Sequence, residues 1–261
     1  MGLAARQTTP VDGDELLTGA GESGVPSVDR LDEIARGYDP SDPTQHFDYW
    51  LKRLQVQCIS PWLRGERVLE LGCATGELTS LLAPLARAYD VVEGSPHNVE
   101  IAQARVPNAT FFTCMWEDFT PAAQYTDLVM FNALEHSADP VGLLHQIRPW
   151  LAPGGRAHIV VPNGLSLHRL VGVEMGLQPD PLALTAGDTA QGHLRNYTVE
   201  SLTTDLQAGG LTVAHMQPVF LKVLPNTKML DWEWPLIEAM HHVAQRFPEN
   251  GAEIYAVGEL S

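Results

Sequence analysis

A pair of glycines follows a short apolar run that has the composition of a buried strand. In VLELGCATGELTSLLA (residues 68–83), Gly72 and Gly76 enclose Cys73 in a turn that leads into a helical pattern. Glycine lets the backbone turn tightly and approach a ligand closely, and the first N–H groups of the following helix are free to bind it. The pattern predicts a nucleotide-like ligand at the carboxyl end of this strand. A turn that needs glycine for its geometry alone is the alternative.

Two carboxylates lie near this turn in the sequence. Glu93 ends the apolar run AYDVV, about 20 residues after the turn, and Gly94 follows it. A carboxylate there can accept two hydrogen bonds from the neighbouring hydroxyls of a ribose. Glu70 lies within the first apolar run, where a charge without partners is costly, so a binding role is favoured. The alternatives are a solvated acid at a strand end for Glu93 and an acid satisfied by loop amides for Glu70.

Histidines occur at two further places that could do chemistry. His136 follows the apolar run DLVMFN, and His193 lies in GHLRNYT. An imidazole with a pKa of about 6.5 can take a proton from a hydroxyl or an amine. An extended backbone would place His193, Arg195 and Tyr197 on one side, where they could hold a polar or anionic compound. Otherwise His136 is a partly buried residue, Arg195 pairs with an acid and Tyr197 packs beneath the last helix.

The elements that must position these residues alternate regularly. Short runs rich in Val, Ile, Leu and Phe are separated by segments with helical spacing; they are RVLELG, AYDVVEG, ATFFTC, TDLVMFN and RAHIVVPN. This alternation predicts right-handed βαβ units and an α/β fold with a doubly wound, mostly parallel, Rossmann-like sheet. Two last runs, LTVAHMQPVF and EIYAVGEL, are expected to complete a seven-stranded sheet with an antiparallel edge strand.

The sequence divides into three parts. Residues 1–26 lack apolar periodicity and are expected to form a flexible leader. Residues 27–64 are expected to form a helical cap, with one helix that begins at the N-cap Ser27 and a second within HFDYWLKRLQVQCISPWL. Residues 65–261 are expected to form the catalytic domain, in which 163–197 lack a strand signal and form an insertion beside the substrate.

Composition excludes several classes of protein. The 261 residues are 44% hydrophobic with a formal net charge of −16, which predicts a sizeable core and disfavours nucleic acid and anionic membranes as partners. Three scattered cysteines predict neither a disulfide framework nor a zinc cluster. The pair His241 and His242, expected on the outer face of the last helix, has no partner at metal-ligand spacing, so we expect no metal. Without an apolar run of about 18 residues, we expect a cytoplasmic protein with no membrane contact.

Four motifs in order resemble class I S-adenosylmethionine-dependent methyltransferases of the small-molecule, UbiG-like type. They are ELGCATG (70–76), the acid in VVEGS, DLVMFNALEH (127–136) and LAPGGRAHIVVPN (151–163). The resemblance implies S-adenosylmethionine as cofactor and S-adenosylhomocysteine as product. It also implies cofactor contacts from Glu70, Gly72, Cys73, Gly76, Glu93, Gly94, Met115, Trp116, Glu117 and Asn132.

The resemblance assigns particular tasks to some of these residues. Glu70 would orient the glycine turn and help to hold the amino group of the methionine moiety. Met115 stands where the family commonly has Asp, so recognition of the adenine amino group would fall to Glu117, Asp118 or the backbone. Trp116 is either a wall of the adenine site or ordinary core.

The reaction implied by the resemblance is methyl transfer to oxygen or nitrogen of a small-molecule acceptor, in secondary (natural-product) metabolism, by a monomer or homodimer. His136 or His193 would accept the proton. Two alternatives stay open: an enzyme that uses S-adenosylmethionine for cyclisation or another group transfer, and a cofactor-binding partner subunit without activity of its own. The residues expected to contact the acceptor are Tyr38, on a mobile loop, His168, Arg195 and Tyr197.

Overall fold

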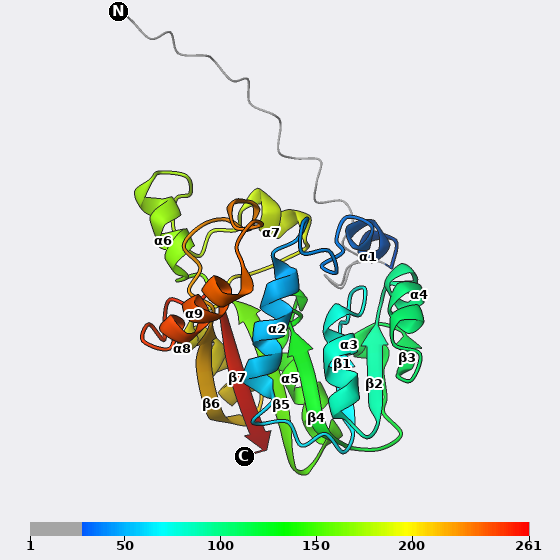
Figure 1. Ribbon diagram of the computed structural model, residues 1–261. Helices are drawn as coiled ribbons and strands as arrows, with labels where there is room; N and C mark the ends of the chain where they lie inside the picture. The colour runs from blue at the N-terminus through cyan, green and yellow to red at the C-terminus, as the bar shows by residue number, and fades with distance from the viewer. Residues whose placement is uncertain (1–27, 261) are drawn as a thin grey trace, which may run out of the picture.

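The computed structural model describes residues 28–260, which form a seven-stranded sheet with helices on both faces (Figure 1). The expected leader, residues 1–26, and the expected N-cap Ser27 lie outside the described residues. The strands are β1 (Val68–Leu71), β2 (Tyr89–Glu93), β3 (Thr110–Thr113), β4 (Tyr125–Phe131), β5 (Leu151–Pro162), β6 (Leu211–Val219) and β7 (Glu253–Leu260). They lie side by side in the order β3-β2-β1-β4-β5-β7-β6.

The direction of the strands confirms the predicted fold class. β1 pairs in parallel with β2 and β4, and parallel pairs with β3 and β5 extend the sheet on either side. β7 runs antiparallel to both β5 and β6 and lies between them, so the predicted antiparallel pair forms one edge of the sheet. The protein therefore has a mostly parallel, seven-stranded, Rossmann-like α/β sheet.

Helices cover both faces of the sheet because the parallel strands are apolar on both faces. Leu69 and Leu71 of β1 belong to a core cluster with α5 (Pro140–Ile147) and α8 (Val199–Ala208). Val68 belongs to a second cluster, with α2 (Asp48–Ile59) and α9 (Trp234–Ala244). The remaining helices are α1 (Val28–Ala35), α3 (Glu77–Leu82), α4 (Pro96–Arg105), α6 (Leu167–Glu174) and α7 (Ala186–Ala190).

Two segments lie over the carboxyl ends of the parallel strands. Figure 1 shows α1, from residues 28–64, and α7, from residues 163–197 after β5, above the same end of the sheet. Residues 163–197, the expected insertion, start and end side by side, because Asn163 and Tyr197 form an isolated parallel bridge. Thr198 is the N-cap of α8, and its side chain accepts a hydrogen bond from the N–H of Ser201. These two segments place side chains from distant parts of the sequence at one end of the sheet.

The expectation that His241 and His242 share an outer surface is wrong for His241. Ile237, His241 and Ala244 lie on the buried face of α9, at the spacing of one helical stripe. The side chain of His241 is near Cys58, and its Nδ1 accepts a hydrogen bond from the N–H of Phe220 at 3.2 Å. His242 is exposed, as expected.

Among residues 28–260, no helix has the length and apolar character that crossing a membrane requires.

Candidate active site

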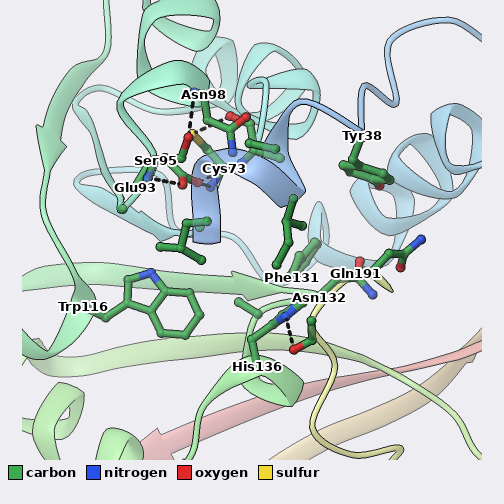
Figure 2. Close-up of a pocket in the computed structure, with 18 of the residues that line it drawn as sticks. Tyr38, Cys73, Glu93, Ser95, Asn98, Trp116, Phe131, Asn132, His136 and Gln191 are labelled. Atoms are coloured by element: carbon green, nitrogen blue, oxygen red, sulfur yellow. Dashed lines mark hydrogen bonds between the residues drawn. The ribbon is translucent and has the colours of Figure 1, made fainter. Parts of the chain in front are cut away.

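A cavity of about 380 Å³ lies at the carboxyl ends of β1, β2 and β4 (Figure 2). Doubly wound sheets bind ligands at this place, where the strand order reverses. Leu31 and Ile34 of α1 line one side of the cavity, and residues 191–194 line another. Of the predicted cofactor residues, all except Gly76 line it: Glu70, Gly72, Cys73, Glu93, Gly94, Met115, Trp116, Glu117 and Asn132.

The glycine turn after β1 has backbone angles that residues other than glycine rarely adopt. Gly72, Ala74 and Gly76 have φ angles of +77°, +47° and +79°. A Cβ on Gly76 would lie 2.8 Å from the Cβ and 2.9 Å from the Cα of Ala102 on α4. A Cβ on Gly72 would meet the Trp116 ring at 3.3 Å. Gly76 therefore permits the packing of α3 on α4, whereas Gly72 keeps the backbone open to the cavity.

The carboxylate of Glu93 binds this turn directly. Its Oε2 accepts hydrogen bonds from the N–H groups of Cys73 and Ala74, both at 3.1 Å, and its Oε1 accepts one from the N–H of Ser95 at 2.9 Å. Burial raises the pKa of Glu93, and the hydrogen bonds oppose this rise. Because a carboxylate oxygen has two lone pairs, Oε1 can accept a further hydrogen bond from a ligand hydroxyl.

The carboxylate of Glu70 binds the helix rather than the turn. Its Oε2 accepts hydrogen bonds from the hydroxyls of Thr79 on α3, at 2.7 Å, and of Tyr89, at 2.9 Å. The resemblance implies that Glu70 orients the turn. In the structure, however, the N–H groups of the turn donate to Glu93. Burial raises the pKa of Glu70 to about 7. Its Oε1 is buried with no hydrogen-bond partner among the described residues, so a donor on a ligand would satisfy it.

Asn132, at the end of β4, connects segments that are distant in the sequence. Its Oδ1 accepts hydrogen bonds from Lys52 Nζ at 3.0 Å and Gln55 Nε2 at 2.9 Å, and its Nδ2 donates to Glu253 Oε1 at 3.0 Å. Its φ of +53° is unusual for a residue other than glycine and typical of functional sites. Lys52, which was not predicted, also lines the cavity, and its ammonium group is held in place by the hydrogen bond to Asn132.

Gly94, Met115 and Trp116 line the wall of the cavity near α1. A Cβ on Gly94 would lie 2.8 Å from Leu31 Cδ1 and 3.0 Å from Met115 Sδ, so glycine permits the close approach of α1. Trp116 is partly buried against the core of the sheet and also lines the cavity. Trp116 therefore belongs both to the core and to the cavity wall, and its contact with adenine stays a prediction. Glu117 is exposed and lines the cavity edge.

His136 and His193, the two predicted proton acceptors, lie together at the cavity wall. Their rings are perpendicular, with centroids 4.9 Å apart. His136 Nδ1 lies 3.1 Å from the carbonyl oxygen of Gly192, and because a carbonyl only accepts, this nitrogen carries the proton. Burial lowers the pKa of His136 to about 4. Burial also lowers the pKa of His193, and the nearby Asp188 opposes the change. Because both pKa values are lowered from 6.5, the two imidazole rings are mainly neutral at neutral pH.

Glu135 lies beside these histidines and is fully buried. Neither of its carboxylate oxygens has a hydrogen-bond partner among the described residues. Burial raises the pKa of Glu135 to about 8, and the charge of Glu253 adds to the rise. A buried carboxylate without hydrogen bonds destabilises the folded protein unless it is protonated or lies next to a cation.

The remaining predicted acceptor residues lie in different places. Tyr38 lines the cavity, and its hydroxyl donates to Asp48 Oδ2 at 3.0 Å. The structure does not bring the other three to the cavity lining. His168 contacts Ser166, Arg195 donates to the carbonyl of Ala138 at 3.4 Å, and Tyr197 is buried with its hydroxyl donating to Asp205 of α8.

A sheet of this order, with a glycine turn after β1, an acid at the end of β2 and a cavity above both, has the fold and site of class I S-adenosylmethionine-dependent methyltransferases. S-adenosylmethionine is the cofactor of that class. The chain belongs to the family described as "Methyltransferase domain", which matches residues 38–216.

Individual proteins are similar over shorter or more divergent stretches. The chain is similar to a ubiquinone biosynthesis O-methyltransferase of Cereibacter sphaeroides, with 29% identity over 97 residues that cover 35% of this chain and 39% of that protein. It spans 39% to 54% of the length of the curated relatives that it matches.

Two solved structures have the same fold. One is a methyltransferase of Haloferax volcanii in complex with the Trm112 methyltransferase activator, with a TM-score of 0.59, 18% identity, and coverage of 88% of this chain and 94% of that one. The other is the N-methyltransferase NodS of Bradyrhizobium japonicum in complex with S-adenosylhomocysteine, with a TM-score of 0.53, 16% identity, and coverage of 88% and 95%.

Proposed function

We propose that the protein transfers a methyl group from S-adenosylmethionine to an oxygen or nitrogen atom of a small-molecule acceptor, in secondary (natural-product) metabolism. The observation that carries the proposal is a cavity that is lined both by the glycine turn with Glu93 and by His136 and His193. The predicted cofactor residues and the candidate proton acceptors thus face one shared space. Transfer in a line between two bound molecules needs such a shared space.

The residues of the cavity fit the cofactor. The unpartnered Oε1 of Glu70 can accept a hydrogen bond from an ammonium group, and Lys52 offers a positive charge to a carboxylate. The Glu93 carboxylate can accept hydrogen bonds from ribose hydroxyls, and Trp116 provides an aromatic surface on which the adenine ring can pack. When bound, S-adenosylmethionine supplies an electrophilic methyl group on a sulfonium.

The chain itself must hold the acceptor and remove its proton. The low pKa of His136, about 4, leaves its imidazole neutral, and the Gly192 carbonyl places the ring proton on Nδ1. Nε2 is therefore the basic nitrogen and can take a proton from a hydroxyl or an amine. His193 is the second candidate for the same step. Helix α1 and residues 191–194 cover the cavity and limit the access of water.

The acceptor is proposed to be small because the volume of the cavity is limited and the chain is acidic. The volume of about 380 Å³ must hold cofactor and acceptor together. A formal net charge of −16 disfavours nucleic acid. The similar O-methyltransferase and the structurally similar N-methyltransferase leave both oxygen and nitrogen as target atoms. A monomeric or homodimeric state and a cytoplasmic location stay predictions.

The experiment is an assay of the purified protein with S-adenosylmethionine and a panel of small hydroxylated and amino compounds, read by mass spectrometry. The proposal predicts a product heavier by one methylene unit together with S-adenosylhomocysteine. Methylthioadenosine in place of S-adenosylhomocysteine would show attack at another carbon of the cofactor and would contradict methyl transfer. Binding of the cofactor without turnover of any compound in a broad panel would favour a partner subunit.

A further inference from the structure

We propose that Glu135, His136 and His193 form a binding site for one divalent transition-metal ion at the wall of the cavity. Each residue offers one ligand atom, and these atoms all lie within 4.8 Å of one another. An ion with bonds of about 2.1 Å holds its ligands roughly 3 to 3.5 Å apart. To hold an ion, ligand atoms that lie within 4.8 Å of one another must approach by at most about 2 Å.

The unsatisfied state of Glu135 supports the site independently of the spacing. Its side chain is fully buried, and both carboxylate oxygens lack a hydrogen-bond partner among the described residues. His193 Nδ1 is a further buried polar atom without a hydrogen bond, although the Asp188 carboxylate lies 3.8 Å from it. Buried polar atoms are rarely left unpaired in native structures, and a cation would satisfy the carboxylate here.

The orientation of His136 matches that of a metal ligand. Its Nδ1 donates to the carbonyl of Gly192 at 3.1 Å, so the other ring nitrogen keeps a free lone pair. Histidine ligands usually donate their second nitrogen to a carbonyl or carboxylate, which fixes the ring. Gly192 has a φ of +82° and belongs to the segment that also supplies His193, so one short segment positions two of the three ligands.

The donor set indicates the class of ion. Two imidazoles and one carboxylate suit Mn²⁺, Fe²⁺, Co²⁺, Ni²⁺ or Zn²⁺ and leave coordination positions open, whereas Mg²⁺ and Ca²⁺ prefer oxygen ligands. Because His136 and His193 line the cavity, the open positions would face the space proposed for the acceptor. With an ion bound, both imidazoles would serve as ligands instead of proton acceptors. The binding site itself can be tested without turnover.

The probe is Co²⁺ alone, added to the full chain after treatment with a chelator. The proposal predicts visible d–d absorption that saturates at one Co²⁺ per chain, and a higher melting temperature in the presence of Co²⁺. His193→Ala and Glu135→Gln are each expected to weaken Co²⁺ binding by about tenfold or more. The matched control is His242→Asn, because His242 is exposed on α9, outside the cluster.

Two results would overturn the proposal. One is a folded wild-type protein that shows no saturable d–d absorption with Co²⁺. The other is binding that His193→Ala does not change, which would place the ion at another site. Since His193 lies at the cavity wall, this variant decides the question even if Glu135→Gln fails to fold, and circular dichroism without metal verifies its folding.

Discussion

Glu93 and Cys73 are joined by a hydrogen bond of 3.1 Å from the backbone N–H of Cys73 to the Glu93 carboxylate. This bond, repeated at the next N–H of the turn, connects the end of β2 to the loop after β1. The acid expected to bind ribose hydroxyls therefore also shapes the loop expected to bind the methionine moiety. One side chain can couple the two halves of the cofactor site, because a change at Glu93 alters both.

Replacement of Gly76 by alanine is expected to destabilise the fold. The left-handed φ of +79° costs an alanine about 1 kcal/mol, and the new Cβ would lie 2.9 Å from the Ala102 Cα, which cannot move freely. Gly176→Ala is the matched control, because its φ is +69° and nothing lies within 4 Å of its Cβ position. Urea unfolding should show a larger loss of unfolding free energy for Gly76→Ala. Equal losses in the two variants would contradict the packing argument.

Glu70→Gln tests the unpartnered oxygen of Glu70. The amide oxygen can keep the hydrogen bonds from Thr79 and Tyr89, but the other side-chain atom becomes an NH₂ group that repels an ammonium donor. We expect the affinity for S-adenosylmethionine, measured by calorimetry, to fall by about tenfold or more. Glu66→Gln, at an exposed position before β1, should bind as the wild type does. An unchanged affinity in Glu70→Gln would remove Glu70 from the cofactor site.

His241 is expected to make the protein sensitive to acid. Burial lowers its pKa from 6.5 to about 4, so the unfolded chain takes up the proton more readily than the folded one. The contribution of neutral His241 to stability is complete above about pH 6.5 and is lost as the pH falls towards 4. Between about pH 7.5 and 5, the wild type should lose about 2 kcal/mol more unfolding free energy than His241→Gln. Urea unfolding at both pH values measures this difference.

The control for this prediction is the same substitution at an exposed histidine on another helix, His145→Gln on α5, which should keep the pH dependence of the wild type. His145 is not among the groups that shift the pKa of His241, whereas the neighbouring His242 is. If His241→Gln and the wild type lose the same unfolding free energy on acidification, another group causes the acid sensitivity.

The fold was predictable because its signals are local. Apolar runs of strand length, helical spacing between them and glycines at the first turn each depend on a few adjacent residues, and all seven strands follow this pattern. The predicted cofactor residues Glu70 and Glu93 come from the same local signals, since each lies at or near a strand end, and both line the cavity. Spacing did not show which of them binds the turn, because that depends on side-chain directions after folding.

The residues that the sequence did not reveal meet only through the fold. Lys52 and Gln55 of α2 reach Asn132 after β4 and Glu253 at the start of β7, and these three segments are far apart in the sequence. Gln55 is fully buried, so a polar residue among the apolar positions of α2 was the available signal. His193 was predicted from the sequence, but its position next to Glu135, which lies in another segment, was not.

Calorimetric titration of the purified protein with S-adenosylmethionine tests the central claim most directly. The account predicts saturable binding of one molecule per chain, an affinity at least about tenfold weaker in Glu93→Ala, and unchanged binding in Glu200→Ala, an exposed acid of α8. No binding by the folded wild-type protein, or equal affinity in the wild type and Glu93→Ala, would contradict it.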